Sequence, residues 1–234
     1  MANLTNPDGS YVLKRPSKLL PLTRQLSFPL THILYRLPIS PNQITALSMA
    51  AGLAGAWCFS LGEQFSHVVG AICLIACYTL DNCDGEIARL KAMSSEWGAH
   101  FDDFVDWLVD SAFFASLGYG IWRVEDDIMW LWLGVAAALG ATVDYVIDII
   151  LYARAKNESG SQSREEEVVA ARKPEDFADW IIFIFHKLSR ADFCLIVLIL
   201  ALLDVLWVLL PVGAIGAQAY WITDLFKRAR GWHT

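Results

Sequence analysis

Six apolar stretches, each about 17 to 25 residues long, follow residue 40 and limit the folds open to this chain. A helix of this length crosses a hydrocarbon core of about 30 Å. The sequence is 56% hydrophobic and only 18% charged, which is more apolar than ordinary soluble domains. We therefore predict an all-α fold, a polytopic membrane protein with six transmembrane helices. The predicted spans are 43–61, 66–90, 98–122, 128–153, 191–209 and 210–227.

The first 40 residues have a different composition, because basic residues are interspersed with leucines between 12 and 37. This pattern predicts an amphipathic helix in the membrane interface, broken near Pro21 and Pro29, with a soluble capping helix as the alternative. Ser40 and Pro41 then predict the start of the first span, with Ser40 as its N-cap. The predicted domains are an N-terminal cytoplasmic or interfacial segment, 1–40, and a six-helix transmembrane domain, 41–234.

Lysine and arginine in the connections predict the orientation of the spans. Arg123 is the one basic residue expected on the far side, so both termini and the connection between the second and third spans are expected in the cytoplasm. The protein would then be integral to the inner or plasma membrane, in contact with its lipids. The sequence carries no basic footprint of the kind that binds nucleic acid, and we expect no nucleic-acid partner.

Four aspartates stand at the cytoplasmic ends of the second and third spans: Asp81, Asp84, Asp102 and Asp106. Charge is costly near hydrocarbon, so carboxylates there suggest a functional site. Spacings of three and four residues put each pair on one face of its helix, and neighbouring antiparallel helices would bring the pairs together. Carboxylate oxygens favour Mg²⁺, Mn²⁺ or Ca²⁺, which would relieve the repulsion. The sequence therefore predicts a site for one or two divalent cations.

Gly85, Gly98 and Arg89 flank the aspartates. Glycine lets another helix or a phosphate come close to the backbone, and a guanidinium beside a metal cluster can clamp a pyrophosphate. Two alternatives stay open from the residues alone. Asp84 could simply pair with Arg89, and the acidic residues could belong to a cation channel or a cation-coupled transporter.

The run from Asp81 to Arg89, reading D-N-C-D-G-E-I-A-R, together with Gly98, Asp102 and Asp106, resembles the signature of the CDP-alcohol phosphotransferase family. The resemblance implies an enzyme with six transmembrane helices that commonly forms homodimers. It also implies transfer of a phosphate-bearing group from a CDP-linked donor to an alcohol acceptor, with release of CMP. An inactive scaffold is disfavoured because the motif is intact.

The same resemblance implies roles for individual residues. The ligands of two Mg²⁺ or Mn²⁺ ions would be Asp81, Asp84, Asp102 and Asp106. Asp106 would also be the catalytic base that deprotonates the attacking hydroxyl. The contacts of the CDP donor would be Asn42, Thr45, Asp81, Gly85, Arg89 and Ser95.

The candidate residues for the acceptor site suggest two different kinds of acceptor. Arg154 and Arg190, at the cytoplasmic ends of the fourth and fifth spans, suit a phosphorylated acceptor such as an inositol phosphate. Asp144 and Asp148 suit a cationic or polyhydroxy group instead. The motif resembles the inositol-phosphate branch of the family, with CDP-diacylglycerol or CDP-inositol as donor. A phospholipid synthase using serine, glycerol phosphate or an amino alcohol is the alternative.

Overall fold

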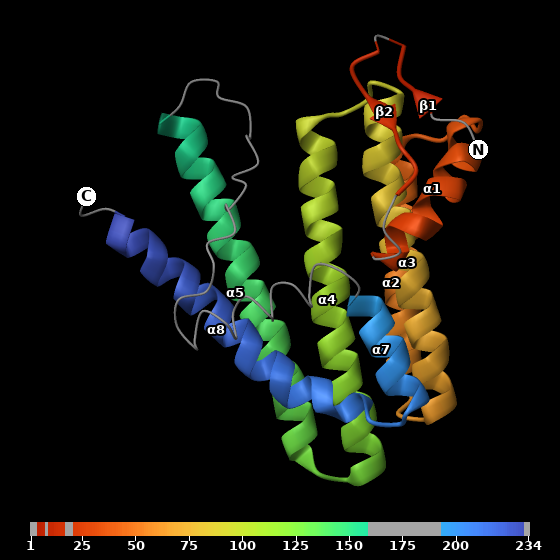
Figure 1. Ribbon diagram of the computed structural model, residues 1–234. Coiled ribbons are helices and arrows are strands. Elements are labelled where there is room, and N and C mark those ends of the chain that lie inside the picture. Colours follow the sequence, from red (N-terminus) through yellow and green to blue (C-terminus); the bar gives the residue numbers. More distant parts are fainter. Residues whose placement is uncertain (1–3, 8, 17–20, 159–192, 232–234) are drawn as a thin grey trace.

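The computed structural model describes residues 4–7, 9–16, 21–158 and 193–231, which are mostly helical (Figure 1). A small antiparallel hairpin pairs β1 (Leu4–Thr5) with β2 (Val12–Leu13). The longer helices are α1 (Leu22–Tyr35), α2 (Pro41–Phe59), α3 (Gln64–Leu90), α4 (Glu96–Glu125) and α5 (Ile128–Glu158). The chain then continues through α7 (Phe193–Leu202), the 3₁₀ turn η1 (Leu206–Val208) and α8 (Leu209–Gly231).

Helix α2 begins where the sequence predicts, and the predicted cap is confirmed. The Gln43 N–H donates to Ser40 Oγ at 3.4 Å, and the Ser40 N–H donates to Gln43 Oε1 at 2.9 Å. This reciprocal capping box satisfies two N–H groups that a helix start would otherwise leave unpaired. Pro41 occupies the first turn, where its missing N–H costs nothing.

The N-terminal prediction is wrong in two details. Residues 12 and 13 form strand β2, and Pro29 lies inside α1 without ending it. A proline removes one backbone hydrogen bond from a helix, and packing can offset that loss. Helix α1 packs along α3, so it is more than a segment lying on a membrane surface. Helix α1 begins directly after Pro21, its N-cap, and the four residues before Pro21 lie outside the described part of the chain.

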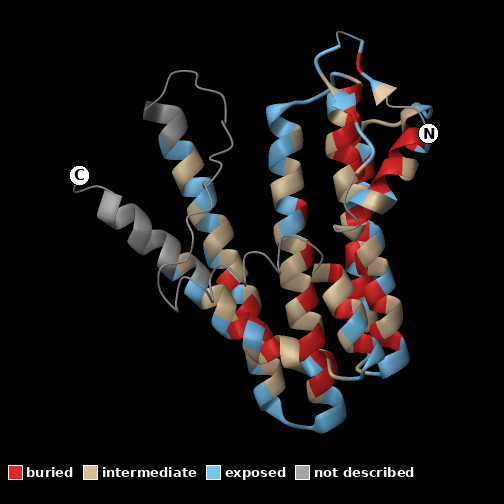
Figure 2. Cartoon of the chain, in the orientation of Figure 1, coloured by how far each residue is buried: buried red, intermediate tan, exposed pale blue. Residues whose placement is uncertain are grey.

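Helices α2, α3 and α4 pack together to form the core, and α5 joins it along α4. Figure 2 shows buried residues gathered along the faces where these helices meet. Phe59, Leu74, Phe113 and Leu117 are among the fully buried side chains of the main cluster. The motif residues lie near the other end of α3 and α4 from Phe59, beside the α3–α4 turn at the top of Figure 1.

The structure supports some of the predicted spans and not others. Helices α2 to α5 correspond to the first four, and α3 and α5 are long and apolar enough to cross a membrane. The described part of α7 has 10 residues, so the described residues do not confirm six transmembrane helices. The predicted end of the fifth span at 209 is wrong, because α7 ends at Leu202, whereas α8 begins at Leu209, one residue before the predicted start of the sixth span. The chain turns after Leu202, where Asp204 adopts a left-handed φ of 59°, a conformation that aspartate tolerates better than most residues.

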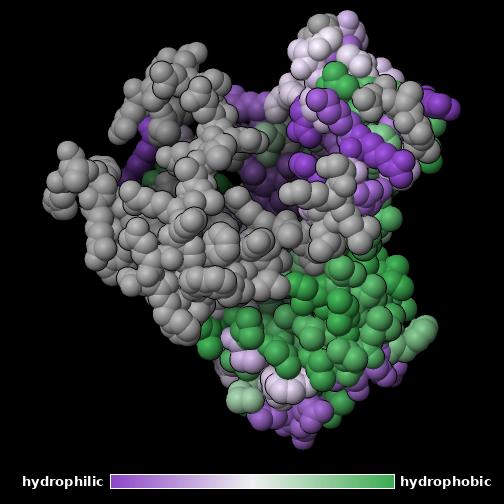
Figure 3. All heavy atoms as spheres, viewed as in Figure 1, coloured by the Kyte–Doolittle hydropathy of each residue, from purple (hydrophilic) through white to green (hydrophobic). Residues whose placement is uncertain are grey.

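On the face that Figure 3 shows, the coloured surface is apolar over the lower half and hydrophilic at the motif end and at the lowest tip. Large apolar side chains that face outward include Trp57, Phe65 and Ile72, with exposed fractions of 70%, 78% and 55%. Soluble monomers rarely expose apolar surface of this extent, whereas a lipid-facing surface requires it. The aspartate motif therefore lies at a polar end of an apolar body.

Candidate active site

Three of the four aspartates converge between α3 and α4. One carboxylate oxygen from each of Asp81, Asp102 and Asp106 lies within 4.8 Å of the others. Asp81 comes from α3, whereas Asp102 and Asp106 come from successive turns of α4. Asp102 and Asp106 therefore share one face of α4, as their spacing of four residues predicts, and that face is turned toward α3.

The residues present fit a divalent metal ion. Oδ1 of Asp81 and Oδ1 of Asp102 are buried, and neither has a hydrogen-bond partner. Buried carboxylate oxygens without partners are costly unless a cation or a donor satisfies them. An all-oxygen set at this separation matches the ligands that Mg²⁺ and Mn²⁺ prefer.

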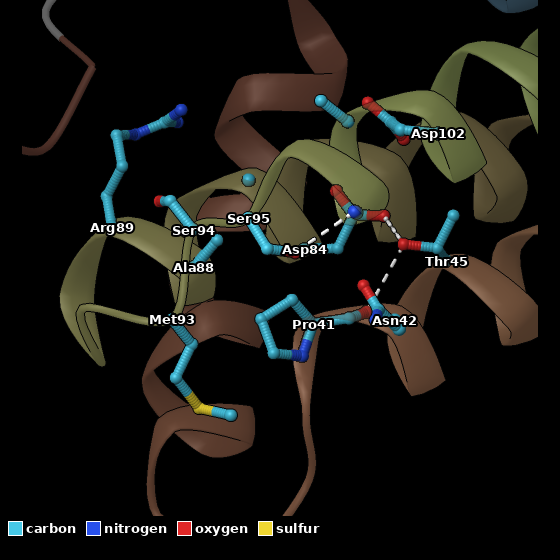
Figure 4. A pocket seen from close by; sticks show the side chains of 13 residues that line it. Pro41, Asn42, Thr45, Asp84, Ala88, Arg89, Met93, Ser94, Ser95 and Asp102 are labelled. Atoms are coloured by element: carbon cyan, nitrogen blue, oxygen red, sulfur yellow. Dashed lines mark hydrogen bonds between the residues drawn. The ribbon is translucent and has the colours of Figure 1, made fainter.

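The fourth aspartate, Asp84, is held differently. It is buried, and its Oδ2 accepts a hydrogen bond of 2.6 Å from Thr45 Oγ1 on α2 (Figure 4). Thr45 Oγ1 also lies 3.2 Å from the Pro41 carbonyl, but a hydroxyl has one proton and the shorter contact with a carboxylate is the stronger one. Thr45 thus fixes Asp84 from a third helix.

A pocket of about 190 Å³ opens beside this cluster, between the start of α2, the end of α3 and the start of α4 (Figure 4). Its lining includes the predicted donor residues Asn42, Thr45, Gly85, Arg89 and Ser95, together with Asp84 and Asp102. Asp81 belongs to the carboxylate cluster and is not part of this lining. The pocket therefore joins most of the predicted donor contacts to two of the predicted metal ligands.

The first turn of α4 forms one wall of the pocket. Ser95 is the N-cap of α4, and its Oγ accepts the Gly98 N–H at 3.0 Å. A Cβ on Gly98 would stand 3.1 Å from Asn42 Oδ1 and 3.0 Å from Ser95 Oγ, so a larger residue would crowd both. Backbone N–H groups at the start of a helix attract anions, which makes this wall suited to a phosphate.

Arg89 lines the same pocket from α3. Its side chain is exposed and folds back along α3, so that Nη1 lies 3.4 Å from the position that a Cβ on Gly85 would take. Its guanidinium carbon lies 5.2 Å from the centre of the Tyr11 ring in the N-terminal hairpin. A guanidinium with five N–H donors at the rim of a pocket is well suited to a phosphate or pyrophosphate.

A second, larger pocket of about 540 Å³ lies between α4 and α5. Asp106 lines it as well as belonging to the carboxylate cluster, so this residue borders both spaces. The carboxylates of its lining are Asp103, Asp106, Asp110, Asp144 and Asp148. Trp107 and Tyr145 stack there with ring centres 5.1 Å apart. A molecule bound in this pocket would have Asp106 in its wall.

The two predicted acceptor arginines have different outcomes. Arg154 is exposed near the end of α5 and is absent from the lining of the second pocket, although its neighbour Ala153 is part of it. Arg190 lies outside the described residues. Asp144 and Asp148 do line the pocket, as their spacing on one helix face suggests.

Sequence reasoning missed several contacts of the site. It did not pair Thr45 with Asp84, and it gave no role to Tyr11 or Glu86. Glu86 is buried, and its carboxylate accepts hydrogen bonds from Ser27 Oγ at 3.2 Å and Thr31 Oγ1 at 2.6 Å. A signal was available for Glu86, since a glutamate in a helix predicted to pack in the core requires hydrogen-bond partners.

The sequence model of the CDP-alcohol phosphatidyltransferase family matches residues 38–223, and the chain belongs to that family. Among curated relatives, a bifunctional IPC transferase and DIPP synthase of Aquifex aeolicus is 33% identical over 104 residues, 44% of this chain and 23% of the relative. A phosphatidylinositol phosphate synthase of Streptomyces avermitilis is 34% identical over 100 residues, 43% of this chain and 39% of the relative. The chain thus matches less than half the length of either relative.

Solved structures agree with this fold. The phosphatidylinositol phosphate synthase of Mycobacterium tuberculosis with CDP-DAG bound gives a TM-score of 0.57 at 23% identity, covering 87% of this chain and 92% of that one. The same enzyme in complex with manganese and citrate gives a TM-score of 0.55 at 23% identity, covering 86% and 87%. The family and the apolar surface together identify the chain as a membrane protein.

Proposed function

We propose that the chain is a metal-dependent transferase, which moves a phosphate-linked group from a CDP-alcohol to the hydroxyl of an acceptor alcohol and releases CMP. The convergence of Asp81, Asp102 and Asp106 beside the Arg89 pocket carries this proposal. It combines a cation site with a phosphate-binding wall at the polar end of an apolar body. A lipid donor could therefore reach the site while its acyl chains stay in the bilayer.

In this proposal the donor and the acceptor bind in separate pockets. The donor occupies the smaller one, where Arg89 and the first turn of α4 bind its pyrophosphate. Ser95 Oγ accepts the Gly98 N–H and can still donate its own proton to a phosphate oxygen. Asn42 and Thr45, on the α2 side, lie toward the nucleotide.

The acceptor occupies the larger pocket, where Asp106 can reach its hydroxyl. In the reaction the hydroxyl oxygen bonds to the donor phosphorus, the bond from that phosphorus to the CMP oxygen breaks, and the hydroxyl proton passes to Asp106. One or two Mg²⁺ or Mn²⁺ ions would neutralise the pyrophosphate and the charge that develops on CMP. Asp81, Asp102 and Asp106 would hold the first ion, and Asp84 would contribute to a second.

The names of the relatives support an inositol-phosphate acceptor, with CDP-diacylglycerol or CDP-inositol as donor. Arg154 and Arg190 remain the predicted contacts of its phosphate. The five carboxylates around the larger pocket keep the alternative open, which is a phospholipid synthase using serine, glycerol phosphate or an amino alcohol. Family membership favours a transferase over a cation-coupled transporter. Homodimer formation and a cytoplasmic site with both termini cytoplasmic are further parts of the proposal.

The test is a screen for CMP release by the purified full chain in Mg²⁺ or Mn²⁺. CDP-diacylglycerol and CDP-inositol are each paired with inositol phosphate, inositol, glycerol phosphate and serine. At least one pair should release CMP, and a chelator should stop the release. Folded protein that releases no CMP from any pair would contradict the proposal. Protein that moves cations across liposomes and is not stabilised by CDP would point to a transporter instead.

A further inference from the structure

The N-terminal hairpin lies before residue 38, where the match to the family begins, yet it contacts a residue that lines the pocket of the proposed donor. The Tyr11 ring lies 5.2 Å from the guanidinium carbon of Arg89, which lines that pocket. We propose that Tyr11 is a positioning residue that holds Arg89 toward the donor pyrophosphate. The N-terminal segment is then part of the donor site. This inference rests on the proposed function, because it assumes that the pocket binds a CDP group.

The hairpin holds Tyr11 in place by two hydrogen bonds between Asn6 and the Tyr11 backbone. The Asn6 N–H donates to the Tyr11 carbonyl at 3.1 Å, and the Tyr11 N–H donates to Asn6 Oδ1 at 3.0 Å. Leu4 pairs with Leu13 in the two-stranded ladder. A two-stranded hairpin is at best marginally stable alone, so it needs an anchor on the rest of the fold.

Leu13 provides that anchor. It is 4% exposed and packs in a small cluster with Phe28 of α1 and Leu90 of α3. Tyr11 packs against the same cluster. Leu90 directly follows Arg89 in the chain, so the cluster joins the hairpin to the backbone that carries the guanidinium.

Two further attachments fix α1 and the connection after it onto the end of α3. The carboxylate of Glu86, one turn before Arg89, accepts hydrogen bonds from the Ser27 and Thr31 hydroxyls of α1. Lys91 Nζ donates to the Leu37 carbonyl at 2.8 Å and to the Ile39 carbonyl at 2.9 Å. The motif end of α3 is thus held from Ser27 to Ile39, and the hairpin extends this support to Arg89 itself.

An exposed arginine gains from such support. Its long side chain samples many rotamers in water, and ordering it on binding opposes affinity. A tyrosine face attracts a guanidinium through the ring quadrupole, and at an exposed site this is worth about a two- to fivefold change in an equilibrium constant. Tyr11 holds Arg89 beside Gly85 before the pyrophosphate arrives, and so favours donor binding without touching the reacting atoms.

The experiment measures the affinity of the full chain for CDP in Mn²⁺ by calorimetry. We expect Tyr11→Leu to weaken CDP binding about two- to fivefold, because it removes the ring, and Tyr11→Phe to bind as the wild type does. Val12→Ala, a change in the same hairpin at a side chain that is 36% exposed, is the matched control and should leave the affinity unchanged.

The Arg89→Lys background separates positioning from a general effect on folding. Lysine keeps the charge but lacks the planar guanidinium, so Tyr11→Leu should cost less there than in the wild type. An equal loss in both backgrounds, no loss with Tyr11→Leu, or the same loss with Tyr11→Phe or Val12→Ala would overturn the inference. Absence of CDP binding by the folded wild-type chain would count against the proposed function itself.

Discussion

At the residue scale, the carboxylates of the site differ in whether a hydrogen-bond donor satisfies them. Asp84 has a hydroxyl donor, whereas Asp81 and Asp102 each keep a buried oxygen without one. A buried acceptor that loses its donor costs about 1–3 kcal/mol. Clustered negative charges without a cation also repel one another. Removing the donor to Asp84 should therefore destabilise the chain, whereas removing one of the clustered carboxylates should stabilise it when no metal is bound.

Thr45→Val should lower the free energy of unfolding by about 1–3 kcal/mol, because valine has the shape of threonine but cannot donate to the buried Asp84. Thr45→Ser keeps the hydroxyl and is the matched control. Thermal unfolding of the detergent-solubilised chain measures both. Equal stability of Thr45→Val and the wild type would mean that this hydrogen bond contributes little.

Asp81→Asn should stabilise the metal-free chain, because it removes one of three converging negative charges. The same change should abolish most of the stabilisation that Mn²⁺ gives to the wild type, since one ligand is lost. Glu63→Gln, at an exposed carboxylate at the start of α3, should leave both values unchanged. A full Mn²⁺ response in Asp81→Asn would argue against a metal at this cluster.

At the element scale, α3 is held from two sides at its motif end. Helix α2 reaches it through Thr45, and α1 reaches it through Ser27 and Thr31. The spacing of the motif places the aspartates along α3 and α4. The contacts from α1 and α2 fix the orientation of α3, and so the direction in which its aspartates point. These two helices therefore belong to the site as much as the helices that carry the motif.

Thr31→Val should destabilise the chain by about 1–3 kcal/mol, because the buried Glu86 carboxylate would lose its shorter hydrogen bond. Thr31→Ser should restore the stability of the wild type. Thermal unfolding measures the change, and CDP affinity shows whether it reaches the donor pocket. Unchanged unfolding of Thr31→Val would show that α1 is held mainly by its apolar contacts.

The sequence predicted the features that local patterns determine. Four helices follow from long apolar runs, and the start of α2 follows from Ser40 and Pro41. The pair Asp102 and Asp106 follows from spacing on one helix. Contacts between segments far apart in the chain could not be predicted from such local patterns. The bond from Thr45 to Asp84 joins residues 39 positions apart, and the one from Thr31 to Glu86 joins residues 55 apart.

At the scale of the whole molecule, an apolar body carries its polar site at one end (Figure 3). The cluster lies where the smaller pocket and the larger pocket approach each other, and Asp106 belongs both to the cluster and to the larger pocket. This placement suits the proposed transfer, because each proposed substrate would have a pocket beside the cluster. It also makes Asp106 the residue on which the proposed chemistry depends most.

The most direct test compares CMP release by the wild-type chain and by Asp106→Asn, in Mn²⁺, with the donor and acceptor that the screen identifies. A positioned base contributes about 10²- to 10⁴-fold to a rate. We predict a loss of at least that order, because Asp106 is both the proposed base and a proposed metal ligand, while Arg89 and the start of α4 keep part of the CDP affinity. Release of CMP by Asp106→Asn at the wild-type rate would contradict the account.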